Sequence, residues 1–179
     1  KPDRRKTAHM ATVDLYSLLP RVAPYLRMCP DTVAKQGLRE AAHLFCRETE
    51  IWRVTLDAIH TSVGEDSYTL PPPTGAILLR VLKVEVDESV QNEDTYEVTP
   101  EGVLVFTTAP TTANLDIVCD IVALPGESLT EYPDWLVNRW NDALVAGAKG
   151  LLMLQAGNDW GNEKTGRLFF ETFERMIGT

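Results

Sequence analysis

The first fifty residues place apolar side chains at the spacing of an α-helix. Asp14–Leu26 follows this spacing, and Pro20 interrupts or restarts the helix. A second helix is predicted to begin at Asp31 or Thr32, either of which can cap it, and to run to about Glu48. Its apolar residues form one stripe, so the helix should bury one face against a core.

The period changes at Trp52, where apolar and polar residues alternate as they do in strands. Pro71–Pro73 cannot be helix or central strand and is expected to be an extended connector. Thr99–Gly102 has turn chemistry and is predicted to join two strands as a hairpin. About five or six strands are expected, with the clearest signals over these segments: Trp52–Ala58, Ile77–Val86, Thr95–Val98, Val103–Thr107 and Leu115–Leu124.

Helical spacing returns at Pro133, which suits a first helical position because its missing N–H would be unpaired there. Apolar residues then trace one broad face to Gln155. Small residues on this helix would let another backbone approach closely: Ala143, Ala146, Gly147, Ala148 and Gly150. Gly157–Asp159 is predicted to end this helix and to cap a last one over Asn162–Ile177, with Gly178 as its terminator.

These elements predict an α+β fold, in which an antiparallel bundle of N- and C-terminal helices carries an inserted antiparallel β module. We expect a single domain over residues 10–179, helical over 11–50 and 130–178, with the β insert at 51–127. Such a small sheet cannot bury both of its faces by itself. The bundle or a neighbouring subunit should therefore cover one of them.

Residues Lys1–His9 are basic and polar, and the segment ends in the His-Met pair that a common cloning site encodes before a start codon. We interpret it as a vector-derived tag and Met10 as the native start. The tag holds four basic residues and one acidic residue, so excluding it changes the formal charge from −9 to −12. A chain this acidic is a poor candidate for gripping nucleic acid through its phosphates.

The three cysteines, Cys29, Cys46 and Cys119, are odd in number and far apart, which does not describe a disulfide framework. They suit a protein made in a reducing cytoplasm, where thiols serve as small hydrophobic groups. The longest apolar run, Ala143–Gly157, is too short for a bilayer span and carries Lys149. No membrane span is predicted.

Catalytic and metal-binding patterns are scarce. The native histidines are His43 and His60, and no G-x-S-x-G nucleophile motif occurs. A zinc site could be imagined from His43, Cys46 and Cys29, but no C-x-x-C pair supports it, and a core cysteine beside an edge histidine is the simpler interpretation. The spacing in Gly157–Thr165 is wrong for a phosphate-binding loop. We therefore expect no enzyme activity, no cofactor and no metal.

Tryptophan is the one unusual aromatic signal. The chain has four: Trp52, Trp135, Trp140 and Trp160. Their simplest role is packing where the bundle meets the sheet. Because aromatic residues are enriched at subunit contacts, they are also our interface candidates.

Several stretches taken together resemble the head-to-tail adaptor, or tubular tail, proteins of tailed bacteriophages, over residues 11–178. The stretches that carry this resemblance are Asp14–Tyr25, Leu38–Arg47, the strand at Trp52, Tyr68–Pro71, Ile77–Val86, Tyr132–Leu136, Ala143–Leu154 and Asn158–Asn162, followed by a Phe-rich helix. None of them is a catalytic motif, and the family has no compact set of functional residues to transfer.

The resemblance implies a non-enzymatic virion protein that assembles as a dodecameric ring beneath the portal protein. It also implies a tail or nozzle protein as the second partner, and genomic DNA that passes through the channel without specific binding. Isolated copies could remain monomeric until they meet the portal. Val137–Leu154 and the β module are the expected contact regions.

Two alternatives remain. The chain could be another phage neck or tail-completion protein, which its position in the virion would distinguish. It could instead be a small-molecule enzyme or binding module. A pocket with polar groups converging on His43 or His60 would favour that second alternative.

Overall fold

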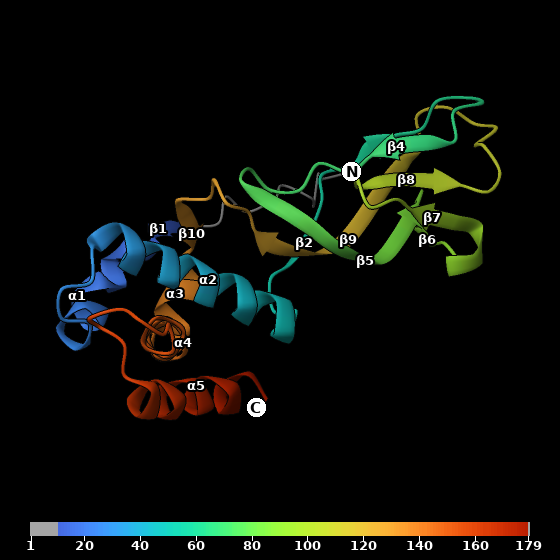
Figure 1. Cartoon of the computed structure of the whole chain (residues 1–179). Coiled ribbons are helices and arrows are strands. Elements are labelled where there is room, and N and C mark those ends of the chain that lie inside the picture. Colours follow the sequence, from blue (N-terminus) through green and yellow to red (C-terminus); the bar gives the residue numbers. More distant parts are fainter. Residues whose placement is uncertain (1–10, 179) are drawn as a thin grey trace. The chain divides into compact units, whose positions relative to one another are not determined.

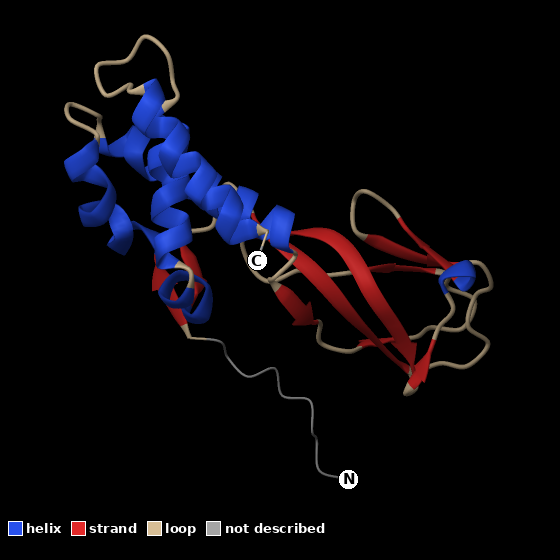
Figure 2. Ribbon diagram, turned by 90° about the horizontal axis from the view of Figure 1, so that it is seen from below, coloured by secondary structure: helices blue, strands red, loops and turns tan. Residues whose placement is uncertain are grey.

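The computed structural model describes residues 11–178 and confirms the α+β class, with helices on both sides of an inserted antiparallel β region in the sequence. The predicted tag, Lys1–His9, lies outside the described residues. The described chain divides into two compact units. Residues 51–124 form the β unit, and the described residues up to Glu50 and from Pro125 form the helical unit (Figure 1; Figure 2).

The helical unit opens with a short strand and a broken helix in place of the continuous helix predicted from Asp14. Strand β1 (Thr12–Asp14) leads into η1 (Leu15–Leu18), α1 (Leu19–Val22) and η2 (Ala23–Tyr25). Prolines sit in the first turn of α1 and of η2, and this placement divides the segment into single turns. Leu15 and Val22 are fully buried, so the predicted apolar face does enter the core.

Helix α2 (Asp31–Thr49) has the predicted extent, but its predicted cap is wrong. Pro30 occupies the N-cap position without a side-chain hydrogen bond, and Asp31 is the first helical residue. An aspartate there still favours the positive end of the helix dipole. The helix buries one stripe completely, as its spacing predicts: Leu38, Ala41, Ala42, Phe45 and Cys46.

The helix predicted over Pro133–Gln155 is two helices. Pro133 ends strand β10 (Glu131–Pro133), α3 spans Asp134–Arg139, and α4 spans Asn141–Met153. Trp140 lies between them with φ −110° and ψ 18°, outside helical geometry. Strand β10 pairs antiparallel with β1, with Val13 opposite Tyr132. The sequence pattern missed both strands of this small sheet.

Helix α4 packs against both α2 and α5, as Figure 1 shows. Small residues make this approach possible. A Cβ at Gly150 would lie 2.8 Å from the backbone nitrogen of Phe170, and one at Gly147 would lie 2.9 Å from the Phe173 ring. The predicted close approach of a second backbone is therefore confirmed for α4, with α5 of the same chain as the neighbour.

Helix α5 spans Glu163–Ile177 and ends at Gly178, close to the predicted bounds. Its cap differs from the prediction. Asn162 occupies the N-cap, and its side-chain oxygen accepts a hydrogen bond from the Thr165 backbone N–H at 3.1 Å. Gly157–Asp159 belongs to the preceding turn.

The β unit contains eight strands, more than the five or six predicted, and six of them have only two to four residues. Their bounds are β2 Arg53–Thr55, β3 Ile59–His60, β4 Ser67–Thr69, β5 Ala76–Val86, β6 Ser89–Val90, β7 Tyr96–Val98, β8 Val103–Phe106 and β9 Asp116–Pro125, with η3 at Glu93–Thr95. One sheet has the order β2-β9-β5-β6, with β3 also on β9, and a second has the order β4-β8-β7. The single strand predicted from Trp52 is thus divided between β2 and β3.

The predicted hairpin at Thr99–Gly102 is confirmed, because β7 and β8 pair antiparallel on either side of it. The Thr99 backbone N–H donates to the Val103 carbonyl at 2.9 Å, and Gly102 adopts a φ of 80° that suits glycine. The Tyr68 and Phe106 rings meet edge to face at 5.9 Å in the core of this unit.

None of the helices in residues 11–178 has the length and apolar character needed to cross a membrane.

Candidate functional site

The four tryptophans lie on separate elements. Trp52 is buried just before β2, Trp135 is half-buried in α3, Trp140 joins α3 to α4, and Trp160 lies in the turn between α4 and α5. No two of these rings contact each other within residues 11–178. Their role at a subunit contact stays a prediction.

Trp140 has the clearest structural role of the four. Its ring packs 5.2 Å from that of Phe45, and the Arg139 guanidinium lies 5.5 Å from its centroid. The Nε1 groups of Trp52, Trp140 and Trp160 are buried without a hydrogen-bond partner among residues 11–178. An unpaired buried donor costs about 1–3 kcal/mol, so apolar packing must hold these rings in place.

The histidines and cysteines do not converge. His43 Nδ1 lies 3.0 Å from the Pro125 carbonyl oxygen, and His60 Nδ1 lies 3.0 Å from an Asp116 carboxylate oxygen on the protein surface. Burial raises the pKa of the Cys46 thiol to about 12. Within the described chain, no three His, Cys, Asp or Glu side chains group closely enough to hold a metal ion.

A groove of about 690 Å³ runs along α2 in the helical unit. Arg39, His43 and Arg47 line it from one face of α2, because residues four apart share a helix face. The Arg39 guanidinium donates to the Glu127 carbonyl oxygen at 3.1 Å across the groove. Since Glu40 and Glu127 also line it, the groove is mixed in charge and carries no clear preference for anions.

Lys149 is the least expected polar residue of the helical unit. It lies on α4 and is only 6% exposed. Its ammonium lies 3.5 Å from the centroid of the Tyr25 ring and 5.0 Å from that of Phe169. Burial lowers the pKa of Lys149, and the neighbouring Arg21 charge lowers it further. A cation over aromatic faces is stabilised by the ring quadrupole, which compensates in part for lost water.

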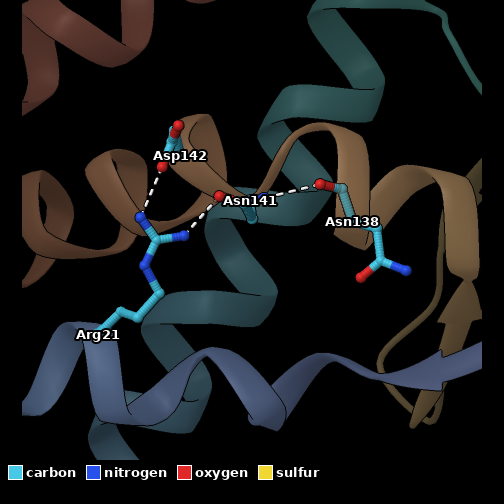
Figure 3. Close-up of polar contacts among 4 residues, drawn as sticks. All are labelled: Arg21, Asn138, Asn141 and Asp142. Carbon is cyan, nitrogen blue, oxygen red and sulfur yellow. Dashed lines mark hydrogen bonds and ion pairs between the residues drawn. The ribbon is translucent and has the colours of Figure 1, made fainter.

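Arg21 binds the first turn of α4, as Figure 3 shows. Its two terminal nitrogens donate to the Asn141 side-chain oxygen and, at 2.6 Å, to the Asp142 carboxylate. The Asn141 amide donates in turn to the Asn138 carbonyl oxygen at 2.7 Å. These contacts tie α1 to the junction of α3 and α4, where the predicted single helix breaks.

Large apolar side chains remain on the surface of both units. In the helical unit they include Tyr25, Met28 and Leu168, exposed by 53%, 83% and 59%. In the β unit, Ile77 and Leu79 of β5 are exposed by 48% and 37%. Exposed apolar groups that gather on one element often mark a contact with another molecule.

Sequence comparison finds no match to any family model and none among curated proteins.

The sequence pattern missed Lys149 and the open edge of β5 as features of interest. A lysine inside an otherwise apolar run was the available signal for the first. The second had no comparable signal, because it depends on the contrast between β5, with 11 residues, and its partner β6, with two, and the sequence pattern did not predict β6.

Proposed function

We propose that this chain is a structural virion protein, the head-to-tail adaptor that joins the portal to the tail in the neck of a tailed phage. The observation that carries the proposal is the combination of a helical unit with an inserted β unit whose longest strand, β5, is paired on one edge only at Glu85 and Val86, by the two-residue strand β6. Adaptor-like stretches run through both units.

Ring closure is the physical mechanism of the proposed function. An uncovered strand edge favours pairing with another chain, and identical head-to-tail contacts between copies close into a ring when their rotation allows it. The exposed apolar residues on β5 and around Tyr25 would be covered in such a ring. The resemblance adds the number of copies, which is twelve, and the two partners of the ring, a portal on one side and a tail or nozzle protein on the other.

The charge of the chain suits a DNA channel. At −9 over the whole sequence, it repels phosphates and would let genomic DNA slide through a ring without sticking. In this proposal DNA is a passenger, with no specific site, and the protein is assembled into the virion from the host cytoplasm.

A non-enzymatic role is supported by the state of the reactive groups. The Cys46 and Cys119 thiols are buried and have a pKa raised by that burial to about 12, so both are protonated at neutral pH. The His60–Asp116 pair is exposed at 67% and 49% of its side chains, so water surrounds it. Neither arrangement resembles an activated nucleophile in a dry cleft.

The test is assembly with the portal protein encoded in the same genome. Sedimentation of the mixture should give a complex with a ring of adaptor copies, and electron microscopy should place that ring on one end of the portal. Absence of any complex, at concentrations where both proteins are soluble, would overturn the proposal. A complex that forms elsewhere in the neck would favour a different neck or tail-completion protein.

The α2 groove favours one alternative from another class, a small-molecule binding module, because its volume of about 690 Å³ falls in the range of ligand pockets. Nothing in the groove selects a ligand class. Thermal-shift screening of the chain against a metabolite library tests this alternative, and a hit that Arg39→Ala abolishes would support it.

A further inference from the structure

The turn Leu26–Cys29, between η2 and α2, places two side chains in solvent. The Cys29 backbone N–H donates to the Leu26 carbonyl oxygen at 3.1 Å, which closes the turn around Arg27 and Met28. Met28 is exposed by 83%, the largest value among the large apolar side chains of residues 11–178. Arg27 is also exposed, and it has no ion-pair partner in that part of the chain.

The backbone conformation at Met28 is one that favours glycine. Its φ is 63°, and a positive φ at the third position of a turn is strained for a residue with a Cβ. Leu26, which is 3% exposed, and Pro30, at the N-cap of α2, fix the turn on its two sides. A rigid, strained turn that still holds a long apolar side chain in solvent indicates a contact with another molecule.

Tyr25 extends this exposed surface. It is 53% exposed, even though its ring contacts Phe169 and Lys149. Tyrosine, arginine and methionine are enriched at the centres of protein interfaces. We call residues Tyr25–Met28 the anchor loop.

The charges around the anchor loop indicate an acidic partner. Residues 15–30 include two arginines, Arg21 and Arg27, and no acidic residue. Asp142 binds Arg21, so Arg27 remains without a counter-charge. Asp31 follows the loop, but it lies in the first turn of α2 and forms no ion pair with Arg27.

The charge of the whole chain is divided unequally between the two units. Residues 51–124, the β unit, contain 12 acidic and 3 basic residues, whereas the helical unit contains 13 acidic and 10 basic residues over 11–50 and 125–178. The β units of two copies therefore repel each other. A β unit of one copy and the anchor loop of another attract each other, which favours a head-to-tail contact between copies.

The turn between β5 and β6 combines free carboxylates with an exposed apolar side chain. Asp87 and Glu88 are exposed and have no ion-pair partner among residues 11–178, and Val90 is exposed by 63%. The two acidic residues have φ values of 48° and 65° in a hairpin turn that usually takes Asn-Gly. The Asp87 backbone N–H donates to the Asp116 carbonyl oxygen at 2.9 Å, so the turn is held against β9.

The loop at Val63, which is exposed by 66%, is the closest alternative in the β unit. Glu65 and Asp66 follow it, but Asp66 already accepts a hydrogen bond from the Ser67 hydroxyl at 2.7 Å. The β5–β6 turn therefore presents the stronger negative charge to an arginine.

We propose that the anchor loop of one copy binds the β5–β6 turn, Asp87–Val90, of a second copy. Arg27 meets the two carboxylates of the turn, while Tyr25 and Met28 cover Val90. Because the two surfaces differ, each copy gives one and receives the other, and the contact repeats head to tail until a ring closes. This inference rests on the proposed adaptor ring and specifies one of its contacts.

Charge reversal tests the contact. Arg27→Glu and Glu88→Arg should each weaken self-association about tenfold or more, measured by sedimentation with and without portal, because like charges then meet at every contact. The double variant Arg27→Glu/Glu88→Arg restores opposite charges, so it should recover assembly to within about threefold of wild type. Single variants that assemble normally, or a double variant that stays as weak as either single variant, would overturn the contact.

Glycine substitutions separate an interface role from a structural one. Met28→Gly removes the exposed side chain and relieves the strain of a positive φ. Its melting temperature should therefore not fall, while self-association weakens about tenfold or more. Glu88→Gly should behave in the same way, because glycine suits its position in the hairpin turn. Full self-association in both glycine variants would contradict the contact.

Glu65→Arg is the matched control, since it makes the same change of charge beside the other exposed valine of the β unit. It should leave assembly unchanged, and a loss larger than that from Glu88→Arg would overturn the contact. If Arg27→Glu weakens only portal binding and Glu88→Arg has no effect, the portal covers the anchor loop and the contact between copies is wrong. A wild-type chain that fails to self-associate even with portal would contradict the adaptor ring and the contact together. Normal rings from both single variants would contradict the contact alone.

Hydroxyl-radical labelling gives a second measurement that needs no substitution. Met28 and Val90 should be modified at least about fivefold more slowly in the assembled wild-type protein than in the monomer, because both lie inside the contact. Val63 should be modified equally in the two states. Equal modification of Met28 and Val90 in both states would overturn the contact, even if a charge-reversed chain did not fold.

Discussion

The Lys149 ammonium lies 3.5 Å from the centroid of the Tyr25 ring, and no carboxylate in residues 11–178 pairs with it. Tyr25 and Phe169 meet edge to face at 5.6 Å and both border the lysine. The charge of Lys149 is therefore stabilised by aromatic rings, within a stretch of α4, residues 143–150, that is buried and otherwise apolar. This arrangement makes the stability of the helical unit depend on the protonation of one lysine.

We expect this lysine to give the protein a measurable pH dependence. Burial lowers the pKa of Lys149 below 10.5 in the folded chain, so the unfolded chain binds the proton more tightly. The free energy of unfolding should then rise as pH increases from the folded pKa toward 10.5, and stay at its lower level below the folded pKa. Denaturant titrations of wild type and Lys149→Met, between neutral pH and pH 10.5, measure the difference.

Lys149→Met is the informative comparison because methionine keeps the length of the side chain without its charge. The rise should be missing in this variant. Its free energy of unfolding at neutral pH should differ from that of wild type by about 1 kcal/mol or less, because losing the cation–π attraction is offset by removing the cost of burying a charge. Parallel pH profiles for the two proteins would contradict the expectation. Lys149→Glu should cost about 3 kcal/mol or more, because an uncompensated buried carboxylate is left.

The contact between α4 and α5 predicts that Gly150 cannot be enlarged. A Cβ there would lie 2.8 Å from the Phe170 backbone nitrogen and 2.9 Å from its Cα, and backbone cannot rotate away as a side chain can. Gly150→Ala should lower the free energy of unfolding by about 1–3 kcal/mol, although alanine is the better helix former.

Gly178→Ala is the matched control for this contact. Its Cβ would meet only the Glu174 carbonyl oxygen at 3.6 Å, and its φ is −80°. Its melting temperature should stay within about 1–2 °C of wild type, because surface substitutions away from special features change little. Equal losses in both variants would show that helix propensity, and not the close approach, determines the effect.

The sequence predicted the order of elements well because each was encoded locally. Helix α2 shows its apolar stripe, and strand β5 its run of branched side chains, within one continuous segment of sequence. Both elements appear nearly as expected. Strands β1 and β10 could not be predicted in this way. Each has three residues, and they pair across more than a hundred positions of sequence. Their stability comes from tertiary pairing, which no local pattern records.

The break at Trp140 has the same origin. Residues on both sides of it follow helical spacing, so the sequence predicts one helix. Tertiary contacts decide otherwise, since Trp140 packs on Phe45 while Arg21 binds the start of α4. The candidate site was still harder to predict. The openness of the β5 edge depends on how short β6 is, and strand pairing alone reveals it.

The N-cap of α5 is Asn162, whereas the sequence predicted that Gly157–Asp159 caps this helix. Asn162→Ala should cost about 1 kcal/mol, because the Thr165 backbone N–H then loses its side-chain acceptor. Asn162→Asp should retain most of the stability. The predicted cap, Asp159, lies in the preceding turn, so Asp159→Ala should be nearly neutral. Thermal unfolding of the three variants provides the measurement, and a larger loss from Asp159→Ala would contradict this assignment.

Thiol labelling should report the two units separately. Cys46 is buried in the helical unit and Cys119 in the β unit, and burial raises the pKa of each thiol to about 12. Cys29 is only partly buried, although burial and the nearby Asp31 charge raise the pKa of its thiol as well. At pH 8, iodoacetamide should therefore modify Cys29 alone in the folded protein, and all three cysteines in denaturant, as counted by intact mass.

Intermediate denaturant concentrations make this labelling more informative. If the two units unfold independently, Cys46 and Cys119 should become reactive at different midpoints, which peptide mass mapping resolves. A Cys29→Ser chain removes the background label without touching either core. Modification of Cys119 at the same rate as Cys29 in the absence of denaturant would show that the β unit opens readily. A single shared midpoint for Cys46 and Cys119 would show instead that the two units unfold as one.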